Sequence, residues 1–219
     1  MILKNRLFER VPPTRDAKSI YIFCEGVRTE YKYFQYFREM DSRINIEIHE
    51  LKPDENNSPK GLMDIAKSCL DKTESNPNPK YEMLAGDEVW VVFDTDPDKL
   101  ETRKPQIVQL REECNNLKWQ VAQSNPCFEV WLYYHFCDKN AEFQGKEISK
   151  EWKRFLDKEF GGFDTRKHPL YIETAAKNAE NNFISQNNQP DIGATEVYKL
   201  SQSILPFVKN KLDAVLKTK

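Results

Sequence analysis

The sequence lacks the features that mark membrane, secreted and zinc-binding proteins. No apolar run approaches the roughly 20 residues of a membrane-spanning helix, and the N-terminus has no apolar signal core. The five cysteines are odd in number, and no two of them stand in a C-x-x-C arrangement. This argues against a disulfide framework and against a structural zinc. We therefore expect a cytoplasmic protein with reduced, buried thiols and no membrane partner.

The common nucleotide-binding and hydrolase motifs are missing as well. The chain has no G-x-x-x-x-G-K-[ST], no G-x-G-x-x-G, no H-E-x-x-H and no G-x-S-x-G. Its three histidines are scattered, which argues against a zinc hydrolase. Charged residues make up 31% of the chain but nearly cancel, leaving a formal net charge of -2. Contact with nucleic acid would therefore need a local basic patch or bound metal ions.

Strand-like and helix-like segments alternate along the first two thirds of the chain. Alternation of this kind predicts an α/β fold with a doubly wound, mainly parallel sheet flanked by helices. The expected strands cover residues 19–25, 44–51, 88–94 and 119–122. The expected helices cover about 30–40, 61–72, a segment opened by Pro105, and 127–136.

The chain divides into three predicted parts. Residues 1–18 form a basic arm, residues 19–140 the α/β core, and residues 141–219 a helical extension packed on the core. The last helix is expected from residue 195 to 205, ending near Pro206. The arm has two interpretations, a solvated terminus or a strand that grips nucleic acid.

Two apolar runs of strand length end abruptly in carboxylates. Glu25 follows one run, and Asp94 and Asp96 follow the other. Ligands of open α/β sheets gather beyond the carboxyl ends of the strands. Close carboxylates repel one another unless a cation lies between them, and hard oxygen ligands suit Mg²⁺ or Mn²⁺. We therefore predict a catalytic metal site at these three residues, the alternative being a solvated acidic turn.

One further acid and one histidine lie in the predicted helix 127–136. Glu129 is in the first turn, where a carboxylate is stabilised by the helix dipole. It is either such a helix-start acid or a fourth metal ligand. His135 lies two turns later on the same helix, and we expect it to be a satisfied or partly buried histidine.

Two groups of cations are candidates for contact with nucleic acid. Arg28, Lys99, Arg103 and Lys104 follow the two acid-bearing strands and could neutralise charge on a phosphoryl oxygen. A second group surrounds Trp152 and includes Lys153 and Arg154. For both groups the alternative is a set of ordinary solvated side chains.

The same residues carry a resemblance to the RloB family. It rests on four motifs in the expected order: FCEGVRTEYKYF (23–34), VVFDTD (91–96), SNPCFEVWL (124–132) and ATEVYKL (194–200). RloB proteins are similar to the Toprim fold, in which a strand-end Glu and a D-x-D bind Mg²⁺ for phosphoryl transfer. The resemblance implies Glu25 as acid/base or metal-linked residue and Asp94 and Asp96 as metal ligands. It also marks Asn125, Pro126 and Glu129 as a motif of unassigned role.

The resemblance leads to a functional hypothesis with two rivals. RloB-like genes are associated with restriction and abortive-infection loci, often beside an ATPase. The leading hypothesis is an Mg²⁺-dependent Toprim-type nuclease that cleaves DNA or RNA in antiphage defence. The first rival is a non-catalytic effector or regulatory subunit of a partner ATPase. The second is nucleotidyl transfer, for which we find no triphosphate pocket in the sequence. Homo-oligomerisation stays open.

Overall fold

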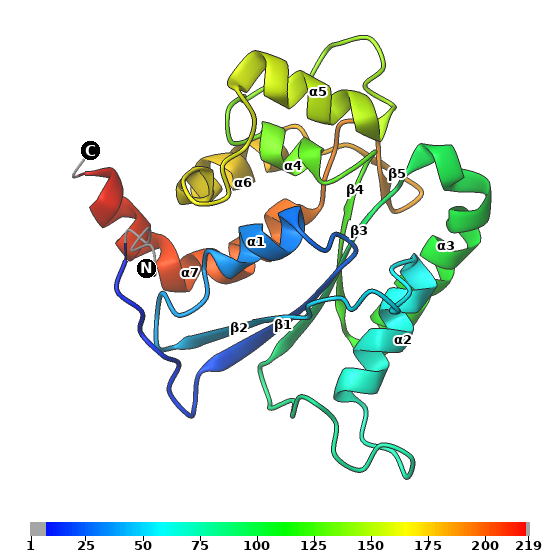
Figure 1. Cartoon of the computed structure of the whole chain (residues 1–219), viewed down its shortest axis with the longest axis vertical. Helices are drawn as coiled ribbons and strands as arrows, with labels where there is room; N and C mark the ends of the chain where they lie inside the picture. The colour runs from blue at the N-terminus through cyan, green and yellow to red at the C-terminus, as the bar shows by residue number, and fades with distance from the viewer. Residues whose placement is uncertain (1–7, 218–219) are drawn as a thin grey trace.

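A four-stranded, all-parallel sheet forms the centre of the protein (Figure 1). The computed structural model describes residues 8–217. Along the sheet the strands follow the order β2-β1-β3-β4. Their bounds are Lys18–Cys24 (β1), Ile44–Ile48 (β2), Glu88–Asp94 (β3) and Gln120–Ser124 (β4). The predicted α/β fold class is confirmed, and the arrangement is consistent with a Toprim-like doubly wound fold.

Helices cover both faces of the sheet, so successive strand residues enter different cores. Ile20 and Ile22 face the core that contains α1 and α7, whereas Tyr21 and Phe23 face α2 and α3. Burial on both faces explains why β1 and β3 are almost continuously apolar. The helices are Thr29–Gln35 (α1), Pro59–Leu70 (α2), Leu100–Leu117 (α3), Glu129–Tyr133 (α4), Ser149–Phe160 (α5), Ile172–Asn181 (α6) and Val197–Leu216 (α7).

His135 lies in the larger core, as predicted from the sequence. Its Nδ1 donates to the carbonyl oxygen of Trp131 at 3.1 Å, and its Nε2 accepts from the Tyr33 hydroxyl at 3.1 Å. Burial lowers the pKa of His135 to about 3, so the ring is neutral at physiological pH. His135 is therefore a satisfied structural residue.

Two prolines lie inside helices that we expected them to begin or end. Pro105 is inside α3, which starts at Leu100 after a 3₁₀ turn at Pro97–Lys99. Pro206 is inside α7, which continues to Leu216. A proline removes one backbone hydrogen bond, and packing of the remaining helix can offset that loss. In α7 the packing comes from Ile204, Val208 and Leu212, all of which are buried.

Other element bounds also differ from prediction. α1 ends at Gln35 because the chain then tightens into turns, with the Phe37 amide bonded to the Phe34 carbonyl at 3.1 Å. α4 has five residues instead of the ten expected. α2 begins at Pro59, capped by the Ser58 hydroxyl, which accepts from the Gly61 amide at 3.2 Å. A short hairpin, β5 (Ser185–Gln186) and β6 (Gln189–Pro190), had no expected counterpart.

The chain after residue 190 is attached to the sheet. Ser124 forms an antiparallel bridge with Thr195, and their hydroxyls lie 2.8 Å apart. The amide of Glu196 donates to the Gln123 carbonyl at 2.8 Å. The motif at residues 194–200 therefore anchors α7 to β4. The domain boundary at residue 140 stays a prediction.

The basic arm is only partly within the described residues, since Lys4 and Arg6 lie outside them. The amides of Val11 and Thr14 donate to the carbonyls of Glu39 and Ser42, both at 2.8 Å. This part of the arm thus lies along the chain that leads into β2.

All five cysteines are free thiols, and four of them are buried. Within residues 8–217 no helix is long and apolar enough to cross a bilayer.

Candidate functional site

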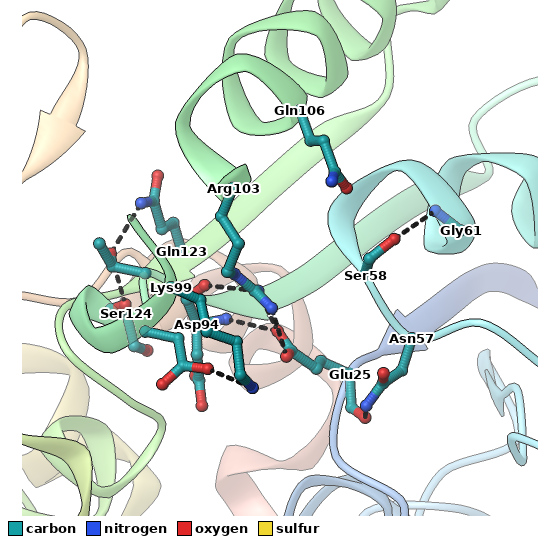
Figure 2. Close-up of polar contacts among 12 residues, drawn as sticks. Glu25, Asn57, Ser58, Gly61, Asp94, Lys99, Arg103, Gln106, Gln123 and Ser124 are labelled. Carbon is teal, nitrogen blue, oxygen red and sulfur yellow. Dashed lines mark hydrogen bonds and ion pairs between the residues drawn. The ribbon is translucent and has the colours of Figure 1, made fainter. Parts of the chain in front are cut away.

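Glu25 lies at the carboxyl end of β1, where the sequence predicted a site residue. Its amide continues the strand pairing by donating to the Val92 carbonyl at 3.0 Å. Its carboxylate accepts from Arg103 Nη1 at 2.9 Å, from Arg103 Nη2 at 2.6 Å and from the Asp94 amide at 3.1 Å (Figure 2). Both oxygens of Glu25 therefore have partners, and this carboxylate is fixed against the end of β3.

Arg103 is a buried residue and not the accessible cation that we predicted. Its side chain is 7% exposed, pairs with Glu25 and donates to the Asp94 carbonyl at 2.9 Å. In this conformation the guanidinium is committed to Glu25 and the end of β3, and contact of Arg103 with nucleic acid stays a prediction. Since α3 starts at Leu100 and not at Pro105, Arg103 is a helical residue whose side chain reaches the strand ends.

Asp94 ends β3 and belongs to a cluster of acids. Burial raises its pKa well above the usual range, and the carboxylates of Glu30, Glu25 and Glu129 raise it further. Arg103 acts in the opposite direction. No ion-pair partner of the Asp94 side chain is found in the described part of the chain. Asp94 is thus a carboxylate held among like charges, and its role as a metal ligand stays a prediction.

Glu30 is a member of this cluster that the sequence reading missed. It is 8% exposed, and its carboxylate packs directly on Gly26, where a Cβ would lie 1.8 Å from Glu30 Oε2. Burial raises its pKa to about 7, helped by Glu129 and Glu25. An acid in the first turn of a helix is commonplace, so position alone gave no signal. The signal available was its place within the motif at residues 23–34.

A methyl group at Gly26 should expel the Glu30 carboxylate from the cluster. In Gly26→Ala we expect the pKa of Glu30 to fall from about 7 towards its ordinary value of 4.5, because the side chain must move towards solvent. Carboxyl ¹³C NMR across a pH titration measures this, with Glu30→Gln assigning the resonance. An unchanged pKa in a folded Gly26→Ala protein would contradict the packing described here.

Asp96 follows the strand in a left-handed conformation, with φ at +49°. Its amide donates to the Pro126 carbonyl at 3.0 Å, and its carboxylate pairs with Lys99 Nζ at 2.9 Å. The intervening Thr95 hydroxyl accepts from Gln123 Nε2 at 2.8 Å, which fixes the loop to β4. In this conformation Asp96 is paired with Lys99 and is not in contact with Glu25.

The motif that begins at Asn125 is explained by its backbone and amide contacts. The Asn125 amide donates to the Ala194 carbonyl at 3.0 Å, its carbonyl accepts from the Gly193 amide at 2.8 Å, and its Nδ2 donates to the Pro190 carbonyl at 2.9 Å. The Asn125–Pro126 peptide bond is cis. These contacts join the end of β4 to the chain before α7. Glu129 then starts α4 and contributes its charge to the cluster.

The donors suit a divalent cation, but they are not assembled around one. All the acids are hard carboxylate ligands, and the raised pKa values of Asp94 and Glu30 reflect crowded, buried carboxylates. Among residues 8–217, however, no three His, Cys, Asp or Glu side chains are grouped so that they could hold one metal ion. Arg103 holds Glu25, and Lys99 holds Asp96. The chemistry therefore fits Mg²⁺ or Mn²⁺, whereas ligation requires side-chain movement.

The remaining predicted cations lie on the surface. Arg28 and Lys104 are exposed, and so are Lys153 and Arg154 on α5. Arg154 forms an ion pair with Glu151 at 2.6 Å, and the Arg154 side chain is 62% exposed. Their contact with nucleic acid stays a prediction.

Comparison with known families identifies the chain. The model of the RloB-like protein family matches residues 20–204, a span that runs from within β1 to within α7 and includes β2, β3 and β4. The chain therefore belongs to the RloB-like family, as its motifs predicted. No curated protein and no solved structure matches it.

Proposed function

We propose that the protein is a Toprim-type, divalent-metal-dependent nuclease that cleaves phosphodiester bonds of DNA or RNA in antiphage defence. The observation that carries this proposal is the acidic cluster at the carboxyl ends of β1 and β3. Carboxylates from β3, α1 and α4 crowd there, beside Glu25 at the end of β1, and the pKa values of Asp94 and Glu30 are raised. Crowded acids of this kind are typical of sites that bind cations or transfer protons.

The acidic side chains have different roles in the proposed reaction. Mg²⁺ or Mn²⁺ bound by Asp94, with Glu25, Asp96, Glu30 or Glu129 as further ligands, would polarise the scissile phosphate. Glu25, which Arg103 orients, would accept a proton from the attacking water. Glu30, whose pKa is about 7, can exchange a proton near neutral pH.

The substrate backbone would be held by exposed cations around the site. Arg28 precedes α1, and Lys104 lies on the exposed side of α3 near the strand ends. Lys153 and Arg154, two exposed cations of α5, are further candidates for this contact. Contacts of this type bind phosphates without reading the base sequence. The proposal therefore includes DNA and RNA.

The experiment is a cleavage assay on a mixed panel of plasmid, single-stranded DNA and tRNA with Mg²⁺ or Mn²⁺. We expect cleavage that EDTA stops and that Glu25→Gln removes. Glu173→Gln is the control, because Glu173 is an exposed carboxylate of α6 that pairs with Lys209. Cleavage retained in Glu25→Gln would contradict the assignment of the site.

One observation favours a second candidate, a non-catalytic subunit of a partner ATPase. Glu25 and Asp96 are already ion-paired with Arg103 and Lys99, so the acids are not ready to bind a metal together. A regulatory subunit needs no assembled site. This candidate predicts no cleavage by the isolated protein with any metal, and stable co-purification with a partner ATPase.

A further inference from the structure

Arg103 is a buried cation whose described polar contacts all lie within the candidate site. Its two terminal nitrogens bind the Glu25 carboxylate, and one of them also binds the Asp94 carbonyl. Its third nitrogen, Nε, is buried and has no hydrogen-bond partner among the described residues. The guanidinium is therefore oriented to donate to Glu25 and to the end of β3, and in this orientation its Nε–H is left without an acceptor.

We propose that Arg103 is a positioning residue that holds Glu25 while no metal is bound and releases at least one of its oxygens when a divalent cation enters. This inference rests on the proposed metal-dependent function. In it, Arg103 supplies the positive charge that the acidic site needs when it is empty of metal. The cation then competes with Arg103 for Glu25.

The geometry supports competition between Arg103 and a metal ion for Glu25, because most of the hydrogen-bond-accepting positions of the Glu25 carboxylate are already used. Its carboxylate accepts three hydrogen bonds, two from Arg103 and one from the Asp94 amide. A bidentate arginine–carboxylate pair is directional and strong, and burial protects it from screening by salt. Ligation of a metal by Glu25 must therefore weaken or break a contact with Arg103.

A purely structural role explains the arrangement less well. Buried ion pairs contribute little net stability, because desolvation of both charges opposes their attraction. Arg111, two turns further along α3, offers a comparison. It pairs with the buried Glu196 and also donates to the Gln123 side chain at 2.7 Å, so it connects α3, β4 and the start of α7. Arg103 connects α3 only to the strand ends that carry the acids.

The inference predicts the direction in which metal affinity changes. Replacing Arg103 by glutamine removes one positive charge and frees Glu25, so Mn²⁺ should bind at least about fivefold more tightly, the value for unit charges about 4 Å apart in bulk water. Arg103→Lys keeps the charge but loses the bidentate geometry, and should fall between wild type and Arg103→Gln.

Isothermal titration with Mn²⁺ compares wild type, Arg103→Gln, Arg103→Lys and the matched control Arg111→Gln. We expect the series above, with no change in the control. Unchanged or weaker Mn²⁺ binding in a folded Arg103→Gln protein would overturn the inference, and so would absence of binding in every variant. Tighter Mn²⁺ binding without nucleic-acid cleavage would leave the inference standing and refute only the nuclease proposal.

A second measurement needs no variant and so covers the case in which Arg103→Gln fails to fold. The side-chain NMR resonance of Arg103 Nε is followed in the wild-type protein while diamagnetic Mg²⁺ is added. We expect the resonance to shift with the same midpoint as Mg²⁺ binding. A resonance that stays fixed while Mg²⁺ binds would show that Arg103 keeps its contacts, and would overturn the inference.

Discussion

Replacing Asp94 by asparagine is expected to reduce metal-dependent cleavage by at least about a hundredfold to a thousandfold, a loss typical of removing one electrostatic group from an active site. Asp94 has no ion-pair partner in the described chain, and its carboxylate lies among Glu30, Glu25 and Glu129. Asparagine keeps the shape of the side chain but removes the negative charge that attracts the cation. Initial rates on the substrate identified by the cleavage panel measure the effect.

The stability of the Asp94→Asn protein separates this loss from misfolding. Removing one of several crowded charges relieves repulsion, so we expect metal-free Asp94→Asn to be at least as stable as wild type at pH 8. Asp98→Asn is the matched control, because Asp98 is exposed on the next turn of the same loop. A stable Asp94→Asn protein with wild-type cleavage would remove Asp94 from the site.

The second large effect is a pH-dependent contribution of Glu30 to stability. Its pKa in the folded protein is about 7, above the 4.5 of an ordinary glutamate, so the folded state holds this proton more tightly than the unfolded state. Stability from Glu30 is fully present below pH 4.5 and is lost as pH rises through 7. The loss is on the order of 3 kcal/mol for a buried group with this shift.

This contribution must be isolated, because His135 acts with the opposite sign. Its pKa of about 3 lies below the ordinary 6.5, so it destabilises the fold as pH falls below 6.5. His135 contributes equally to the unfolding free energies of Glu30→Gln and wild type, so its contribution cancels in the difference between them. We expect that difference to grow in favour of Glu30→Gln between pH 4.5 and 8 when EDTA is present, and to shrink when Mg²⁺ is added.

Urea unfolding at pH 5, 6, 7 and 8 provides these free energies. Tyr33→Phe is a control variant for His135. It removes the hydroxyl that donates to His135 and leaves the acidic cluster in place. A difference between Glu30→Gln and wild type that is independent of pH would show that Glu30 is not a buried acid of raised pKa.

The sheet could be predicted from the sequence because its signal is local. The segments that became β1 and β3 are apolar on both faces, and no helix period fits them. Helix ends were less predictable, since they depend on packing that a local pattern does not contain. Pro206 was expected to end the last helix, but Ile204, Val208 and Leu212 bury the same helix on both sides of it. Tertiary contacts outweighed the local preference.

The candidate site was predictable only in part, for the same reason. Glu25 and Asp94 could be placed because strand ends in a parallel sheet share one edge. Arg103 could not, because which way it faces depends on where α3 begins, and that start was predicted five residues too late. Glu30 was hidden because its burial comes from the bare backbone of Gly26 and from neighbours distant in sequence.

The most direct test of the central claim is anomalous diffraction from crystals soaked with Mn²⁺ at pH 8. We predict an anomalous peak within about 2.2 Å of an Asp94 carboxylate oxygen, with at least one further carboxylate of the cluster as a ligand. We also predict that the contact between Arg103 and Glu25 is lengthened or broken in the same crystals. An Asp94 carboxylate without a bound ion, in crystals that bind Mn²⁺ elsewhere or not at all, would contradict a metal-dependent active site at these strand ends.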